Sequence, residues 1–233
     1  MAWGMENMDA IADSLLMPAM IGWGGSDLLL VFFMWTVMMM AMMLPSAIPL
    51  LLMVAKVNHG RFDRHRALLG TGVFALGYLA MWTGFSAFAT LAQWGLLEVR
   101  LISPMMESTS PWLSAALLAA AGAYEFTPLK NVCLTRCQSP LGILMIGWRE
   151  GISGAFAMGV RHGTYCTGCC WLLMGLLFVF GVMNLAWIAA LAIFVLLQKL
   201  LWQPIWFARA AGASLLFWGA FLAVQASALQ SGI

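Results

Sequence analysis

The chain has 233 residues, of which 63% are hydrophobic and only 9% carry a charge. An ordinary soluble domain has about 25% charged residues, so these few charges cannot cover a globular surface with polar groups. This composition excludes a soluble enzyme, a nucleic-acid binder and a disordered tail. The net charge of +2 is too small to indicate an anionic partner. We therefore expect an all-α, polytopic transmembrane helix bundle surrounded by membrane lipid.

The first 27 residues differ from the rest because they are acidic, with Glu6, Asp9, Asp13 and Asp27. A cleavable signal peptide begins with basic residues, so we expect none here. Residues 10–24 are mildly amphipathic, which favours a helix lying on the outer membrane interface. We assign residues 1–27 to an N-terminal segment on the outer face and residues 28–233 to a membrane domain.

The membrane domain contains six stretches long enough to be spans, since about 20 apolar residues cross ~30 Å of hydrocarbon. They cover residues 28–55, 67–97, 111–130, 166–183, 185–202 and 205–229. Asn184 leaves room only for a tight hairpin between the fourth and the fifth. Residues 131–165 form an insertion on the cytoplasmic side, and residues 139–163 predict two short helices, interfacial or re-entrant.

The basic residues indicate the orientation, because Lys and Arg concentrate in cytoplasmic loops. With six spans, all of the eleven Lys and Arg residues except Arg100 fall on one side of the membrane. We therefore expect these loops in the cytoplasm and both the N-terminus and the C-terminus outside.

All five cysteines lie in one region, at the cytoplasmic ends of the third and fourth predicted spans. Two occur in C-L-T-R-C, and three follow a histidine in H-G-T-Y-C-T-G-C-C. Structural disulfides are not expected in a reducing compartment. A buried cysteine is often a small hydrophobic residue, but this clustering, with pairs at helical i, i+4 spacing, favours a metal site. The candidate ligands here are Cys133, Cys137, His162, Cys166, Cys169 and Cys170.

Clustered thiolates prefer soft metals, namely Cu(I), Zn(II) or an iron–sulfur cluster. The cysteine spacing is not that of a standard zinc finger, although the residues suffice for a zinc site of the Cys3His type. Copper is the cofactor that we expect, with zinc as the alternative.

The first span is rich in methionine, the second signal for a soft metal. Met34, Met38 and Met42 recur at helical spacing and form a column of about 12 Å along the helix. Their thioethers are neutral ligands that suit Cu(I) without adding a buried charge. Methionine is also a flexible packing residue, and both interpretations stay open. Pro45 should kink the span after this column.

Glu125 is the one acidic residue inside a predicted span, and an intramembrane carboxylate is by default a functional candidate. It is a candidate metal ligand, a proton site, or a partner for Arg161 or Lys130. It also fits an interfacial helix end, because Pro128 should break the helix just after it.

Four motifs together resemble one known family. They are M-M-M-A-M-M-L-P-S (38–46), Y-E-F-T-P-L-K-N-V-C-L-T-R-C (124–137), R-H-G-T-Y-C-T-G-C-C-W (161–171) and G-V-M-N-L-A-W (181–187). The family is the bacterial domain-of-unknown-function family 2182, described as predicted metal-binding, in part copper-associated, integral membrane proteins. The resemblance covers roughly residues 28–202.

The resemblance implies a bacterial inner-membrane location and a set of ligands. The implied ligands are Met38, Met42, Cys133, Cys137, His162, Cys166, Cys169 and Cys170. The family has a glutamate before the lysine of the fifth span, where this chain has Gln198, so any role of that carboxylate is in doubt here.

The leading hypothesis is a soft-metal protein, most of all for Cu(I), that acts in metal transport or delivers copper to a membrane cuproenzyme. Its partners would be the metal ion, membrane lipid and a metallochaperone or cuproenzyme, with no nucleic acid. We expect no enzyme activity, and no nucleotide-binding motif is present to drive pumping. Two alternatives stay open: an accessory subunit with a structural Cys/His metal site, and a membrane thiol–disulfide oxidoreductase that uses the C-T-G-C pair.

Overall fold

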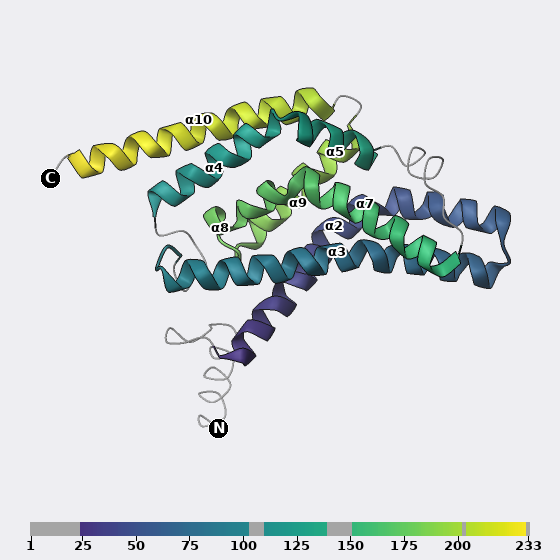
Figure 1. Ribbon diagram of the computed structural model, residues 1–233. Coiled ribbons are helices and arrows are strands. Elements are labelled where there is room, and N and C mark those ends of the chain that lie inside the picture. The colour runs from purple at the N-terminus through teal and green to yellow at the C-terminus, as the bar shows by residue number, and fades with distance from the viewer. Residues whose placement is uncertain (1–23, 103–109, 139–150, 202–203, 232–233) are drawn as a thin grey trace, which may run out of the picture.

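The computed structural model describes residues 24–102, 110–138, 151–201 and 204–231, and every secondary-structure element there is a helix, as predicted (Figure 1). The helices are α2 (Gly25–Arg61), α3 (Arg64–Glu98), α4 (Pro111–Glu125), α5 (Pro128–Gln138), α7 (Gly151–Gly175), α8 (Leu177–Phe180), α9 (Leu185–Leu200) and α10 (Pro204–Ser231). The amphipathic helix expected in residues 10–24 lies almost wholly outside the described residues.

Four stretches in the described residues are long and apolar enough to cross a membrane. They are α2, α3, the nearly continuous pair α7–α8 over Gly151–Phe180, and Ile205–Ala228 within α10. The first, second and sixth predicted spans therefore have matching long helices. A bundle with four such helices agrees with a membrane protein, but it does not support six full spans.

The third and fifth predicted spans are shorter than expected. α4 has 15 residues and α9 has 16, which gives each about 22–24 Å of helix, less than the ~30 Å of hydrocarbon. α4 begins as predicted, with Ser110 accepting from the Leu113 amide and Pro111 in the first helical position. It ends at Glu125, and the Thr127 hydroxyl accepts from the Lys130 amide to cap the new helix α5. Pro128 therefore separates two helices.

The prediction of two short helices in residues 139–163 is wrong for the second of them. Residues 151–165 are not a separate interfacial or re-entrant helix, because α7 continues from Gly151 to Gly175 without a break. The fourth membrane helix therefore begins 15 residues earlier than predicted. The first of the two expected short helices falls mainly on residues 139–150, which lie outside the described residues.

Close approach of α3 and α7 explains why this long helix is rich in glycine. A Cβ on Gly159 would lie 2.0 Å from the Phe74 carbonyl oxygen, and one on Gly77 would lie 2.3 Å from the Phe156 carbonyl oxygen. Only glycine permits this backbone contact. The small-residue stretch that looked interfacial in the sequence is the packing seam between two long helices.

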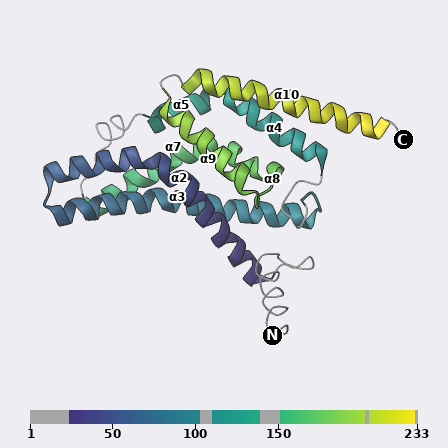
Figure 2. The same cartoon turned by 180° about the vertical axis from the view of Figure 1, so that it is seen from behind.

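The long helices cross and pack against one another in one bundle. In Figures 1 and 2, α2 crosses α3 and bends, as Pro45 and Pro49 lead one to expect, while α9 lies between α7 and α2. α4 and α10 pack side by side. The predicted hairpin before α9 is present, since Asn184 caps α9 through the Ala186 and Trp187 amides, and Gly181 has φ +89°.

Candidate metal centre

The cysteines of α5 and α7 converge although 28 residues or more separate them in the chain. Cys166, Cys169 and Cys170 are at most 1% exposed. The Cys137 side chain lies close enough to Cys166 and Cys169 to interact with both thiols. Cys133 lies against α7 nearby, where its sulfur would be 3.2 Å from a Cβ on Gly168. All five thiols are free.

The thiols of α5 lie outside the long apolar helices, and their surroundings favour the protonated form. Hydrogen bonding toward Cys166 and Cys169, followed by burial, favours the protonated Cys137 thiol and raises its pKa well above the usual value. Burial, followed by the nearby Cys169, raises the pKa of Cys133. Both directions favour the protonated thiol at Cys133 and Cys137.

Cys166 is the residue at which four helices meet. The Tyr78 hydroxyl of α3 lies 3.1 Å from its sulfur, and the Lys199 ammonium of α9 donates to the same sulfur at 2.9 Å. Tyr78 also donates to the Met43 carbonyl of α2 at 3.3 Å, and Lys199 donates to the Ser46 hydroxyl at 2.8 Å. A sulfur atom, a phenol and a positive charge therefore share one buried site.

This site lies near the middle of a membrane-length helix rather than at its end. Cys166 is the sixteenth of the 30 residues from Gly151 to Phe180. The sequence placed it at the cytoplasmic end of a span, because that span was expected to begin at Cys166 itself. Because α7 begins at Gly151, Cys166 lies about 22 Å along the helix axis from the first residue of that helix.

His162 lies one turn before Cys166, as the spacing predicted, and is 3% exposed. Its ring stacks on Tyr78 and on Phe74, with centroids 5.6 Å and 6.3 Å away. Its Nδ1 is buried and has no hydrogen-bond partner among the described residues. Buried polar atoms normally have partners, so this nitrogen is available to a ligand.

The sulfur and nitrogen atoms are near one another but are not arranged as a finished coordination shell. Among the described residues, no group of three or more His, Cys, Asp and Glu side chains is poised to hold a metal ion. The reason is visible in the hydrogen bonds, since Cys169 and Cys170 both donate to the Cys166 carbonyl at 3.0 Å. These thiols must rotate away from their own helix before they can share an ion.

The methionines of α2 divide into two faces. Met39 and Met43 are fully buried, and Met42 is almost so. Met34 and Met38 are half-buried and pack against the edge of the same apolar core. Of the predicted column, Met42 is therefore the residue closest to the interior, while the adjacent column of Met39 and Met43 faces the core. Met43 is linked to Cys166 through Tyr78.

Glu125 lies in a second polar cluster. It forms an ion pair of 2.7 Å with Lys130 and accepts from the Gln198 amide at 3.0 Å, while Lys130 also donates to Gln198 at 3.0 Å. All three side chains are at most 1% exposed. Of the roles that the sequence left open, the structure shows the ion pair with Lys130. Both carboxylate oxygens are already engaged, and a metal or proton role stays a prediction.

The comparison with known families shows the family to which the chain belongs. The sequence matches the family described as "PpoB2: Copper chaperone" over residues 32–222. The chain belongs to this family. No curated protein matches the sequence, and no solved structure matches it. Membership confirms the copper association that the four motifs implied, while the label of family 2182 stays a prediction.

For a member of a copper chaperone family, sulfur donors are the expected chemistry, because Cu(I) is a soft ion. The thiols and the free imidazole nitrogen fit such an ion. Tyr78, Ser46 and Lys199 were not predicted as neighbours of the thiols. Lys199 was counted only as a cytoplasmic charge, although it ends an otherwise apolar helix. Tyr78 is one of only three tyrosines in the chain, and this rarity was a signal that could have marked it as a candidate site residue.

Proposed function

We propose that this chain is an integral membrane protein that binds Cu(I) as its cargo and delivers it to a membrane cuproenzyme. The observation that carries the proposal is the meeting of Cys137 with Cys166 and Cys169 across two helices, in a chain of a copper chaperone family. Soft sulfur ligands from separate helices suit a copper ion that must be both held and released.

The surroundings of the thiols support binding inside an apolar bundle. Ligating cysteines must lose their protons, and a buried thiolate is costly unless a positive charge lies nearby. Lys199 supplies this charge at 2.9 Å from Cys166. The His162 Nδ1, free of other hydrogen bonds among the described residues, offers a further donor. Cys170 and Cys133 are the remaining thiols that we include in the site.

The methionines of α2 are the proposed entry side of the site. Thioethers bind Cu(I) without deprotonation, so they tolerate low dielectric better than thiolates do. Met42 and Met43 lie in the same apolar core as Cys166, and Tyr78 links Met43 to that cysteine. We propose that copper passes between these thioethers and the thiols.

Orientation in a bacterial inner membrane is part of the same proposal. Figure 1 shows the turn between α2 and α3 and the start of α7 at one end of the molecule, with the end of α3 and the C-terminus at the other. The first end carries the basic residues 56–66. The positive-inside rule then supports a cytoplasmic position for that end.

The decisive experiment is metal analysis of protein purified without oxygen. We expect about one to three copper atoms per chain, and a variant with Cys137, Cys166, Cys169 and Cys170 changed to Ser should lose them. His162→Phe should keep the ring stacking and weaken retention of Cu(I) against a competing chelator, while His65→Phe at an exposed histidine should not. A chain that purifies with no copper, or an unaffected cysteine variant, would refute the proposal.

The same samples separate the alternatives. Zinc that resists chelation would favour a structural site in an accessory subunit, and a quinone-dependent disulfide between Cys166 and Cys169 would favour an oxidoreductase. Proteoliposomes with an impermeant Cu(I) chelator trapped inside separate delivery from transport. A chaperone should bind copper without sustained accumulation inside, whereas a transporter should saturate the trapped chelator.

A further inference from the structure

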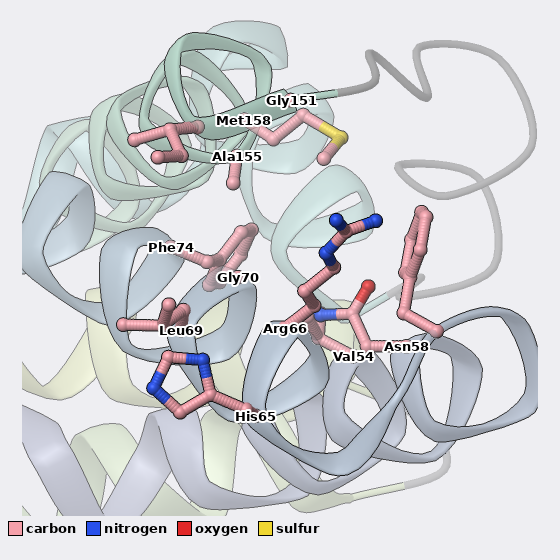
Figure 3. A pocket seen from close by; sticks show the side chains of 12 residues that line it. Val54, Asn58, His65, Arg66, Leu69, Gly70, Phe74, Gly151, Ala155 and Met158 are labelled. Carbon is pink, nitrogen blue, oxygen red and sulfur yellow. The ribbon is translucent and has the colours of Figure 1, made fainter.

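A cavity of about 440 Å³ lies at the basic end of the bundle. It is formed by the last turns of α2, the first turns of α3 and the start of α7 (Figure 3). Val54, Phe74 and Met158 form its buried apolar floor. Leu69 and Ile152 line it where the surface is exposed, so the cavity has an apolar mouth.

Positive charge gathers at one edge of this cavity. Figure 3 shows the Arg66 side chain extending into the space between α3 and α7, with Ala155 and Met158 across from it. Among the described residues, Arg66 has no ion-pair partner. His65 also lines the cavity. Nearby in the sequence are Lys56, Arg61, Asp63 and Arg64.

The spacing of these groups matches an amphiphile. Arg66 and Phe74 are eight residues apart on α3, or about 12 Å along its axis. A ligand with an anionic group at Arg66 would therefore place apolar chain against Phe74. The depth fits the passage from a headgroup layer into hydrocarbon, since α2 and α3 are both membrane-length and turn between Arg61 and Arg64.

We infer that this cavity is a binding site for one anionic glycerophospholipid, with its phosphate at Arg66 and the upper part of an acyl chain in the apolar floor. Charge complementarity selects this occupant over a neutral lipid, because basic pockets between membrane helices bind anionic headgroups on the cytoplasmic side. Phe74 lies between this cavity and His162 of the proposed copper site, and the inference does not depend on copper binding.

Native mass spectrometry of the full chain, released from nanodiscs of phosphatidylcholine with a minor share of phosphatidylglycerol, tests this inference. Wild-type protein should retain one phosphatidylglycerol in preference to phosphatidylcholine. Arg66→Gln should lower that retention about fivefold, the effect of one basic side chain near a membrane surface. Arg64→Gln removes the same charge from an exposed residue that does not line the cavity, so it should retain lipid as the wild type does.

A second variant tests the apolar part of the site. Ala155→Phe fills the cavity and leaves Arg66 in place, so it should also lose the lipid, with thermal unfolding in detergent showing that the bundle is intact. Excess inorganic phosphate should not displace the lipid. Equal losses in Arg64→Gln and Arg66→Gln, full retention in Ala155→Phe, or displacement by phosphate alone would each overturn the assignment.

Discussion

The Lys199 ammonium lies between the Cys166 sulfur, 2.9 Å away, and the Ser46 hydroxyl, 2.8 Å away. A residue near the end of α9 therefore joins the middle of α7 to the middle of α2. Its neighbour Gln198 points into the other polar cluster, between Glu125 and Lys130. Two adjacent residues of one helix thus connect the thiols to the buried ion pair.

Lys199→Met should weaken Cu(I) binding about tenfold, because it removes one charge-assisted hydrogen bond, worth about 1.5 kcal/mol, from a buried thiolate. Competition with a Cu(I) chelator measures the affinity. Lys199→Arg keeps the charge and should bind nearly as well, and Lys56→Met at an exposed position of α2 should have no effect. Undiminished binding in Lys199→Met would remove this lysine from the site.

Met42→Leu should leave the fold intact and weaken copper retention, because leucine fills a similar volume but offers no sulfur. We expect the same direction for Met38→Leu, with a smaller effect because Met38 is only half-buried. Met53→Leu, later on the same helix and packed against a different apolar cluster, is the control. Copper content and thermal unfolding are measured together. Identical copper content in all three variants would exclude the methionine column from the copper site.

Lys130→Met should destabilise the bundle by about 3–5 kcal/mol, because it leaves the Glu125 carboxylate buried without its ion-pair partner. Adding Glu125→Gln should recover much of this loss, since the second charge is then gone as well. Thermal unfolding of the two single variants and the double variant completes a double-mutant cycle. Additive losses would mean that the ion pair contributes nothing as a pair.

Gln198→Glu would introduce a second carboxylate beside Glu125, with only Lys130 to balance both. Like charges at close range raise the cost of ionisation, so we expect a less stable protein whose stability recovers as pH falls and a carboxyl group gains a proton. Unfolding measured across acidic and neutral pH checks the sign. Stability that is independent of pH and equal to wild type would show that the cluster tolerates the extra charge.

Gly159→Ala should cost about 1–3 kcal/mol, because a Cβ at this position meets the Phe74 carbonyl oxygen at 2.0 Å and forces α3 and α7 apart. Gly72→Ala on α3 meets nothing within 4 Å and should instead stabilise its helix by about 0.5–1 kcal/mol. Opposite shifts in unfolding temperature are the expected result. Equal shifts would mean that the helices separate freely at Gly159.

The sequence predicted the features that depend on local composition. Charge-free runs over residues 28–55 and 67–97 correspond to α2 and α3, and the capping signals at Ser110 and Asn184 are used as expected. The i, i+4 spacing correctly placed His162 near Cys166. These properties follow from helical periodicity and from the cost of exposing polar backbone to lipid, both of which a single stretch of sequence reveals.

Only the tertiary structure decided where α7 begins and which side chains surround the thiols. The segment from Gly151 to Val160 is short, rich in small residues and followed by Arg161 and His162, so it does not look like part of a span when read alone. It becomes part of a long helix through its glycine contacts with α3. Likewise, Tyr78 and Lys199 reach Cys166 from residues 88 and 33 positions away. Such contacts depend on how helices pack against one another, and that packing joins distant residues that no local pattern relates.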